Sequence, residues 1–210
     1  MVRVHLEGRG IKDRRVLCAM GEVRREAFVS DDYRGQAYSD GPLPIGDGQT
    51  ISQPYIVALM SQELQVGREC NVLELGTGSG YQTAVLARLA RRVYTVERLG
   101  GLSARAKAVL EGLGVENVEY FVGDGSCGWR GEAESLSGPE SGLFERIMIT
   151  AAVPEVPGPV MEQLAEEGRL VAPVGGPTVQ RLMAYEKVRG RIKERFICDV
   201  RFVRLLGEFS

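Results

Sequence analysis

A glycine-rich turn set between two acidic residues is the part of the chain with the clearest chemical potential. Gly76, Gly78 and Gly80 alternate with hydroxyl residues; Glu74 precedes them and Glu97 lies further along the chain. Glycine lets the backbone adopt positive φ and lets a ligand approach the main chain closely. A carboxylate such as that of Glu97 can accept several hydrogen bonds. This combination predicts a small-molecule site.

Two strands and a helix must position these groups. Val72–Leu75 is a short apolar run that stops at glycine, as a buried parallel strand does. Tyr81–Ala90 shows an apolar helix face without a breaker, and Val93–Val96 makes a second apolar strand. Open α/β sheets bind ligands at the carboxyl ends of their strands, so the turn and Glu97 are expected together at that edge.

The glycine spacing distinguishes between ligand classes. Dinucleotide sites use G-x-G-x-x-G and hold a pyrophosphate at a helix N-terminus. The spacing here resembles instead the E/D-x-G-x-G-x-G turn of S-adenosylmethionine methyltransferases, whose cofactor carries a sulfonium and a free amino acid. This resemblance implies that Glu74 fits the ligand and that Glu97 accepts hydrogen bonds from the ribose hydroxyls. A turn needed only for packing and a dinucleotide site are the alternatives.

Ser52 is the candidate catalytic residue, and it lies just before a predicted helix, Tyr55–Leu64. Pro54 suits the first helical turn, so Ser52 or Gln53 is the natural N-cap. A serine cap stabilises a helix by about 1 kcal/mol. Without its neighbours, Ser52 is better interpreted as a cap than as an active-site residue.

The remaining pattern predicts an α/β fold with a mostly parallel sheet, a C-terminal antiparallel hairpin and an N-terminal extension of helices and loop. The extension contains a helix over Lys12–Phe28 and a long packed loop, Ser30–Thr50, that covers something. The later elements are expected as follows: helix Ala104–Leu113 ended by Gly114, strands Val118–Val122 and Ile147–Thr150, helix Pro157–Ala165, and strands Arg169–Val174, Leu182–Val188 and Phe196–Leu205. In the last strand, Phe196, Cys198, Val200 and Phe202 are expected on the core face.

Composition limits the class of partner and the compartment. The 210 residues carry a formal net charge of -2, without the basic character of a nucleic-acid-binding domain. The basic residues Arg189, Arg191, Lys193 and Arg195 are expected in the solvated turn of a hairpin. The four cysteines form no C-x-x-C pair and are expected to be buried thiols. No signal peptide or membrane span is visible, so we expect a cytoplasmic protein.

Several motifs occur in one order, and together they resemble the protein-L-isoaspartate (D-aspartate) O-methyltransferases from about Val16 to the C-terminus. They are Ala37-Tyr-Ser-Asp40, Pro42-Leu-Pro-Ile-Gly46, Gly48-Gln-Thr-Ile-Ser-Gln-Pro54, Glu74-Leu-Gly-Thr-Gly-Ser-Gly-Tyr81, Gly123-Asp-Gly-Ser126 with Gly128-Trp129, and Ile149-Thr-Ala-Ala152. The Gly48–Pro54 motif is much more specific than the glycine turn, which many methyltransferases share.

The resemblance implies one methyltransferase domain over 1–210. Helices and an active-site loop would occupy 1–65, the cofactor-binding core 66–176 and the C-terminal strands 177–210. Ser52 would lie in the active site. The residues expected to bind S-adenosyl-L-methionine, and the product S-adenosyl-L-homocysteine, are Gln49, Thr50, Ile51, Gly76, Thr77, Gly78, Gly80, Glu97, Asp124 and Gly125. Asp124 is expected to cap a helix or to accept a hydrogen bond from the adenine amino group.

Some positions depart from the family pattern. Arg24 and Arg204 stand where proline is common, Glu145 stands where aspartate is common, and Arg130–Gly142 is longer than usual. Arg204 lies on the last predicted strand, near the expected substrate groove. The preference for residues flanking the substrate is therefore the property most open to change.

The implied reaction is methyl transfer to the free carboxylate of isoaspartyl and D-aspartyl residues in damaged proteins, which initiates their repair. It needs no strong base, because a carboxylate with a pKa of about 3.9 is already ionised at pH 7. The only histidine, His5, lies near the N-terminus, and no metal site is expected. We expect a monomer without nucleic-acid or membrane partners. An RNA methyltransferase of the same fold, and a non-catalytic adaptor for damaged proteins, are the alternatives.

Overall fold

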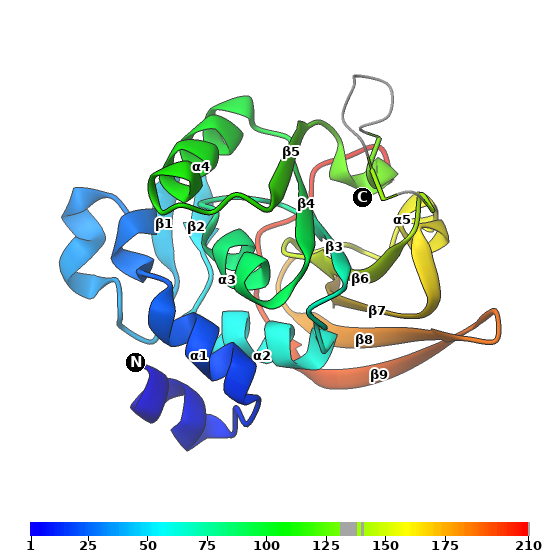
Figure 1. The fold of residues 1–210 in the computed structure, drawn as a ribbon, viewed down its shortest axis with the longest axis horizontal. Coiled ribbons are helices and arrows are strands. Elements are labelled where there is room, and N and C mark those ends of the chain that lie inside the picture. Colours follow the sequence, from blue (N-terminus) through cyan, green and yellow to red (C-terminus); the bar gives the residue numbers. More distant parts are fainter. Residues whose placement is uncertain (131–137, 140, 210) are drawn as a thin grey trace.

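A seven-stranded β-sheet forms the centre of the molecule (Figure 1). The computed structural model describes residues 1–130, 138, 139 and 141–209. Across the sheet the order is β5 (Val118–Val122), β4 (Arg92–Glu97), β3 (Asn71–Leu75), β6 (Phe144–Ile149), β7 (Leu164–Gly175), β8 (Gln180–Val188) and β9 (Arg191–Val200). The first five are parallel to their neighbours, and β8 and β9 are antiparallel. The predicted α/β architecture with a C-terminal hairpin is confirmed.

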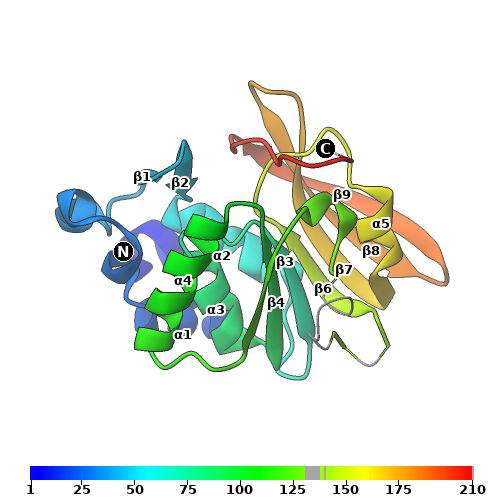
Figure 2. The same cartoon turned by 90° about the horizontal axis from the view of Figure 1, so that it is seen from above.

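Helices cover both faces of this sheet (Figure 2). One face carries α1 (Arg14–Glu22), α2 (Pro54–Leu64), α3 (Tyr81–Leu89) and α4 (Gly100–Gly112), and the other carries α5 (Gly158–Glu162). Successive residues of β3 point to opposite faces, so Val72 joins the core beneath α1–α4 and Leu73 joins the core beneath α5. Every residue of β3 is buried, as expected for a strand covered on both sides.

The direction of the strand order reverses between β3 and β6, which are adjacent. The chain leaves β3 at Gly76 and leaves β6 at Thr150. The Thr150 N–H donates to the carbonyl of Leu75 at 2.9 Å, and the Gly76 N–H donates to that of Val96 at 2.8 Å. The carboxyl ends of parallel strands beside such a reversal form the usual ligand crevice of open α/β sheets.

The stretch Ser30–Thr50 is more ordered than the long loop that we predict. It contains a 3-10 helix, Asp31–Gln36, and a two-stranded hairpin of β1 (Leu43–Gly46) and β2 (Gln49–Ile51). Asp47 and Gly48 both have positive φ, as in the two-residue turns that match strand twist. Figure 2 shows this hairpin above the carboxyl edge of the sheet.

The predicted helix over Lys12–Phe28 is too long at both ends. Helix α1 begins after Asp13, whose carboxylate accepts the N–H groups of Arg15 and Val16, and ends at Glu22. Val23 is extended, and a separate 3-10 turn, Arg25–Phe28, follows. The break places Arg25 in the interior, where its Nε donates to the carbonyl of Ala37 at 2.7 Å.

Several later boundaries also differ from prediction: α4 begins at Gly100 rather than Ala104, β6 at Phe144 rather than Ile147, and β7 at Leu164 rather than Arg169. The helix predicted over Pro157–Ala165 covers only Gly158–Glu162, because the chain joins β7 at Leu164. Strand β9 ends at Val200, and its register shifts between the pairs Met183–Phe196 and Leu182–Cys198. This irregularity breaks the predicted alternation, and Phe196 is 43% exposed beneath the guanidinium of Arg181. The expectation that Phe196 faces the core is wrong.

Of the cysteines, only Cys127 is buried; Cys18 is exposed, and Cys70 and Cys198 are intermediate, so the prediction of four buried thiols is wrong. Arg189 lies in the turn of the β8–β9 hairpin, as expected, whereas Arg191, Lys193 and Arg195 lie in strand β9 and not in the turn; all four are exposed. Among the described residues, no helix has the length and apolar character needed to cross a membrane. Most of the predicted insertion Arg130–Gly142 lies outside the described residues.

Candidate active site

Three adjoining hollows lie at the carboxyl edge of the sheet. The large cleft, of about 450 Å³, is lined by Pro42, Thr50, Ser52, Gln53, Ile56, Thr150, Val179 and residues 199–203. The turn hollow, of about 70 Å³, is lined by residues 49–52, Val57, residues 76–79, Tyr81, Gln82, Glu97, Thr150, Ala151 and Val203. The edge hollow, of about 60 Å³, is lined by Gln49, Gly76, residues 96–99, Gly125, Ala151 and residues 204–206. Because Thr50, Ser52 and Thr150 border both the large cleft and the turn hollow, these two spaces share a wall.

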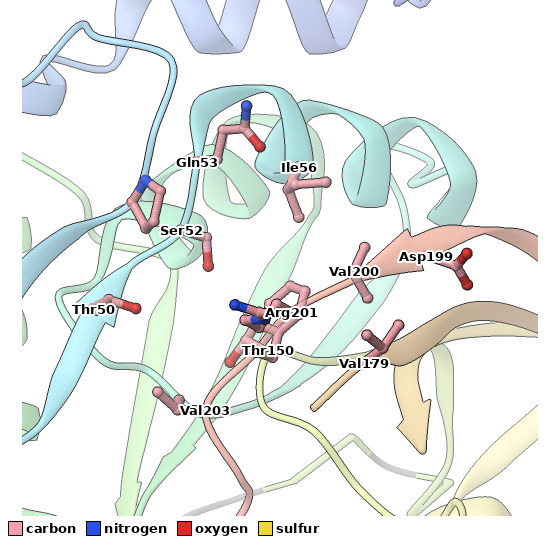
Figure 3. Close-up of a pocket in the computed structure, with 12 residues that line it drawn as sticks. Thr50, Ser52, Gln53, Ile56, Thr150, Val179, Asp199, Val200, Arg201 and Val203 are labelled. Carbon is pink, nitrogen blue, oxygen red and sulfur yellow. The ribbon is translucent and has the colours of Figure 1, made fainter. Parts of the chain in front are cut away.

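Ser52 lies between β2 and α2 and points into the large cleft (Figure 3). The N-cap of α2 is Gln53, and no side chain caps the helix. Within the described part of the chain, the Ser52 hydroxyl makes no hydrogen bond. The interpretation of Ser52 as a helix cap is therefore wrong, and its hydroxyl is available to a ligand.

The three glycines of the turn have different structural roles. All three have positive φ, a backbone conformation that glycine adopts without the strain that a residue with a side chain would have. A Cβ on Gly76 would lie 2.4 Å from Oγ1 of Thr150, and a Cβ on Gly80 would lie 3.1 Å from the Cβ of Ala106 in α4. Gly76 and Gly78 line the turn hollow, whereas Gly80 lines none of the three hollows. Gly80 therefore serves the packing of α3 against α4.

Glu97, at the end of β4, borders both the turn hollow and the edge hollow. Its Oε2 accepts the N–H of Gly78 and its Oε1 accepts the N–H of Leu99, both at 2.9 Å. These bonds fix the carboxylate while leaving lone pairs on each oxygen. The side chain is nearly buried, at 8% exposure, yet it opens onto both hollows.

Glu74 does not line any of the three hollows, so the expectation that it fits the ligand is wrong. It is fully buried, and its Oε2 accepts the hydroxyls of Thr83 at 2.6 Å and Thr95 at 2.7 Å. Because Thr95 donates to Glu74, the 2.6 Å contact between Thr77 and Thr95 requires Thr77 to be the donor. Glu74 thus supports the turn from beneath.

Burial raises the pKa of Glu74 to about 7, although the two threonine hydroxyls oppose this rise. Its ordinary pKa is 4.5, so the folded protein holds a proton that the unfolded chain releases between pH 4.5 and 7. Glu74 therefore lowers the free energy of unfolding as pH rises through this interval, by a total on the order of 3 kcal/mol.

We expect Glu74→Gln to flatten this part of the stability profile, since glutamine keeps an acceptor for both threonines and does not titrate. Urea unfolding at pH 4.5 and at pH 7.5 measures the difference. The wild type should lose more stability than the variant on going to the higher pH. Equal losses in the two proteins would contradict the raised pKa.

Asp124 is occupied by contacts within the chain. Its Oδ1 accepts the N–H and the hydroxyl of Ser126, and its Oδ2 accepts the N–H of Glu208 at 2.7 Å. Although partial burial acts in the opposite direction, these donors hold the pKa of Asp124 below its ordinary value. Asp124 caps the short 3-10 helix Gly125–Cys127, as one of our two expectations proposes. Gly125, but not Asp124, lines the edge hollow.

The structure brings together most of the residues predicted for the site. Gln49, Thr50, Ile51, Ser52, Gly76, Thr77, Gly78 and Glu97 line the turn hollow, and Gly125 joins Gln49, Gly76 and Glu97 at the edge hollow. Sequence reasoning misses Thr150, Ala151, Arg201 and Val203. For the first two, the position directly after a strand beside the reversal point would have been a usable criterion. Arg204 borders the edge hollow rather than the large cleft, contrary to our expectation.

No group of three or more histidine, cysteine or acidic side chains within the described ranges is arranged to hold a metal ion. Hydroxyl, amide and carboxylate groups line the turn hollow, among them those of Ser52, Gln49 and Glu97.

Comparison with known proteins decides the family. The family model for protein-L-isoaspartate(D-aspartate) O-methyltransferases matches residues 1–210. The chain belongs to this family. It is therefore related over its whole length to methyltransferases that use S-adenosylmethionine.

Curated members of the protein-L-isoaspartate O-methyltransferase family are close in sequence. The protein of that name from Methanoregula boonei is 51% identical over 210 residues, covering all of this chain and 93% of the relative. Protein-L-isoaspartate O-methyltransferase 1 of Syntrophobacter fumaroxidans is 48% identical over 210 residues, covering all of this chain and 94% of the relative. The similarity thus includes both the glycine turn and the segment around Ser52.

Solved members of the protein-L-isoaspartate O-methyltransferase family have the same fold. A Plasmodium falciparum chain of this description, in complex with S-adenosyl-L-homocysteine, aligns with a TM-score of 0.82 at 27% identity, covering 98% of this chain and 96% of that one. A second structure, named protein-L-isoaspartate O-methyltransferase, aligns with a TM-score of 0.85 at 29% identity, covering all of this chain and 67% of that one. Both alignments include the C-terminal hairpin as well as the parallel core.

Proposed function

We propose that this chain transfers a methyl group from S-adenosyl-L-methionine to the free carboxylate of L-isoaspartyl and D-aspartyl residues in damaged proteins, which initiates their repair. One observation carries the proposal: in a chain that matches the family throughout, Ser52 lines the wall shared by the large cleft and the turn hollow, and Glu97 lines the turn hollow beside the glycine turn.

The turn and edge hollows fit the cofactor. Glu97 opens onto both hollows, and each of its oxygens has accepted only one backbone N–H. Its free lone pairs suit the two ribose hydroxyls. Because Gly76 and Gly78 carry no side chains, a ligand in the turn hollow can approach the main chain of the turn closely. When bound, the cofactor supplies an electrophilic methyl group on a cationic sulfonium.

The large cleft fits the acceptor. Ser52 would donate a hydrogen bond to one oxygen of the acceptor carboxylate and so direct the other oxygen toward the turn hollow. No general base is needed, because the acceptor is ionised at neutral pH. Pro42, Ile56 and Val203 would exclude water from the carboxylate, which strengthens electrostatic interactions between the reacting groups.

The proposal predicts that isoaspartyl and normal aspartyl peptides of one sequence are labelled very unequally by the purified protein and radiolabelled S-adenosylmethionine. The free carboxylate is bonded to Cα in an isoaspartyl residue and to Cβ in a normal aspartyl residue. A site that fits one of these arrangements beside Ser52 therefore does not fit the other. Base-stable labelling of a transfer RNA, or equal labelling of the two peptides, would overturn the proposal. The label on the isoaspartyl peptide should be released by mild base, as expected for an ester.

We propose further that residues 1–210 act as one domain and as a cytoplasmic monomer that does not bind nucleic acid. The formal charge of -2 supports protein rather than nucleic-acid substrates. All four cysteines are free, which suits a reducing compartment.

A further inference from the structure

The large cleft contains a charged side chain that the proposed reaction does not use. Asp199 and Arg201 are the charged residues among the described residues that line it, and the remaining lining is apolar or neutral. Arg201 follows the end of β9, where the chain leaves the sheet and passes Ser52 toward the edge hollow.

Arg201 is held at one end only. Its Nε donates to the carbonyl of Thr178 at 3.2 Å, which anchors the guanidinium to the segment between β7 and β8. No carboxylate of the described chain pairs with it, and its two terminal nitrogens make no hydrogen bond there. Figure 3 shows Arg201 between Ser52 and Asp199, with the Asp199 carboxylate directed away toward the far side of the cleft.

Asp199 does not neutralise Arg201. In the β8–β9 ladder Asp199 stands directly opposite Arg181, and opposed residues of an antiparallel pair project from the same face. Asp199 therefore projects on the same face as Arg181, whose guanidinium lies over the ring of Phe196, and among the described residues no ion pair joins Asp199 to Arg201. The planar fork of Arg201 is well suited to hold a carboxylate through two parallel hydrogen bonds.

We infer that Arg201 is a specificity-determining residue that binds an acidic side chain next to the isoaspartyl residue of the substrate. This inference rests on the proposed function of the large cleft. The acceptor carboxylate itself is a poor partner for Arg201, because it loses its negative charge when it is methylated. A guanidinium bonded to it would stabilise the starting carboxylate more than the transition state and would slow the reaction. The neutral hydroxyl of Ser52 does not have this disadvantage.

The test uses two series of three isoaspartyl peptides. In one series the residue before the isoaspartate is Glu, Gln or Lys, and in the other series the residue after it is varied in the same way. The wild-type enzyme should prefer Glu over Gln by about fivefold in kcat/KM in one of the two series, as expected for one partly exposed ion pair. The preference should appear in KM, since Arg201 does not contact the transferred methyl group. It should also weaken as salt is raised.

Two substitutions separate a specific role from a general one. Arg201→Gln should remove the preference, and Arg201→Glu should reverse it so that the Lys peptide becomes the best of the three. Arg189→Gln, an exposed arginine at the tip of the β8–β9 hairpin, is the control and should retain the wild-type order. Affinity for S-adenosylhomocysteine should be the same in all four proteins, because Arg201 borders neither the turn hollow nor the edge hollow.

The outcomes distinguish this inference from the function on which it rests. Methylation of all three peptides at one rate by the wild type, or an unchanged order in Arg201→Glu, would overturn the role of Arg201 and leave the methyltransferase intact. Failure to methylate any isoaspartyl peptide would instead overturn the proposed function.

Discussion

Replacement of Glu97 by alanine is expected to weaken the binding of S-adenosylmethionine and S-adenosylhomocysteine by about 2–4 kcal/mol, or roughly 30- to 1,000-fold. The carboxylate borders both small hollows and, in the proposed function, would accept hydrogen bonds from the two ribose hydroxyls. It also fixes the N–H groups of Gly78 and Leu99, so its loss loosens the walls of both hollows. Isothermal calorimetry with S-adenosylhomocysteine measures the loss directly.

Glu119→Ala provides the matched control for Glu97→Ala. Glu119 lies in the neighbouring strand β5 and pairs with Arg92 at the surface, away from both hollows. This variant should bind S-adenosylhomocysteine as the wild type does. Wild-type affinity in Glu97→Ala itself would remove Glu97 from the cofactor site.

Ser52→Ala is expected to lower kcat by about 100-fold, because it removes the donor that directs the acceptor carboxylate. The free energy of unfolding should change by less than about 0.5 kcal/mol, since the hydroxyl caps no helix and makes no hydrogen bond within the described chain. Affinity for S-adenosylhomocysteine should be close to that of the wild type, because the glycine turn and Glu97 are unchanged. Steady-state assays with an isoaspartyl peptide, together with urea unfolding, test both parts.

Ser52→Thr retains a hydroxyl at the same position and should recover part of the lost turnover. Ser39→Ala removes an exposed serine from the segment before β1 and should affect neither turnover nor stability. A fall in turnover that matches a fall in the folded fraction would mean that Ser52 acts only through stability.

The parts of the site that lie close together in sequence could be predicted. The β3–α3–β4 unit contains the glycine turn and Glu97 within one local motif, and strand ends in such a unit must meet at one edge of the sheet. The segment of Gln49 to Ser52 was predicted for a different reason, its resemblance to a known family. Both predictions place these residues around the turn hollow, where the structure has them.

Other features depend on contacts between distant segments, which a linear pattern does not contain. In the sequence, the carboxylate of Glu74 looks as available to a ligand as that of Glu97. In the structure, Thr83 of α3 and Thr95 of β4 donate to it and enclose it. Gly80 resembles its two companions in sequence, yet α4 lies against it. Arg201 and Val203 reach the site only because the chain crosses the sheet edge again after β9.

The hairpin before Ser52 has a local sequence signal. Asp47-Gly48 is the sequence of a two-residue hairpin turn, with the apolar residues Ile45 before it and Ile51 after it, and it predicts the hairpin of β1 and β2. Recognising it would have replaced a long covering loop with a defined hairpin directly before Ser52.

Strand β2 and the two residues that follow it form a wall common to the two small hollows and the large cleft. Gln49 touches both small hollows, and Thr50 and Ser52 touch the turn hollow and the large cleft. A shift of this short strand on cofactor binding would therefore move the acceptor wall as well. By thermodynamic linkage, whatever factor the cofactor contributes to peptide affinity must equal the factor that the peptide contributes to cofactor affinity. In the proposed function, the substrate cofactor and the product cofactor differ by one methyl group and one charge, and this difference would lie at the shared wall. The same strand would then make release of the peptide depend on whether methyl transfer has occurred.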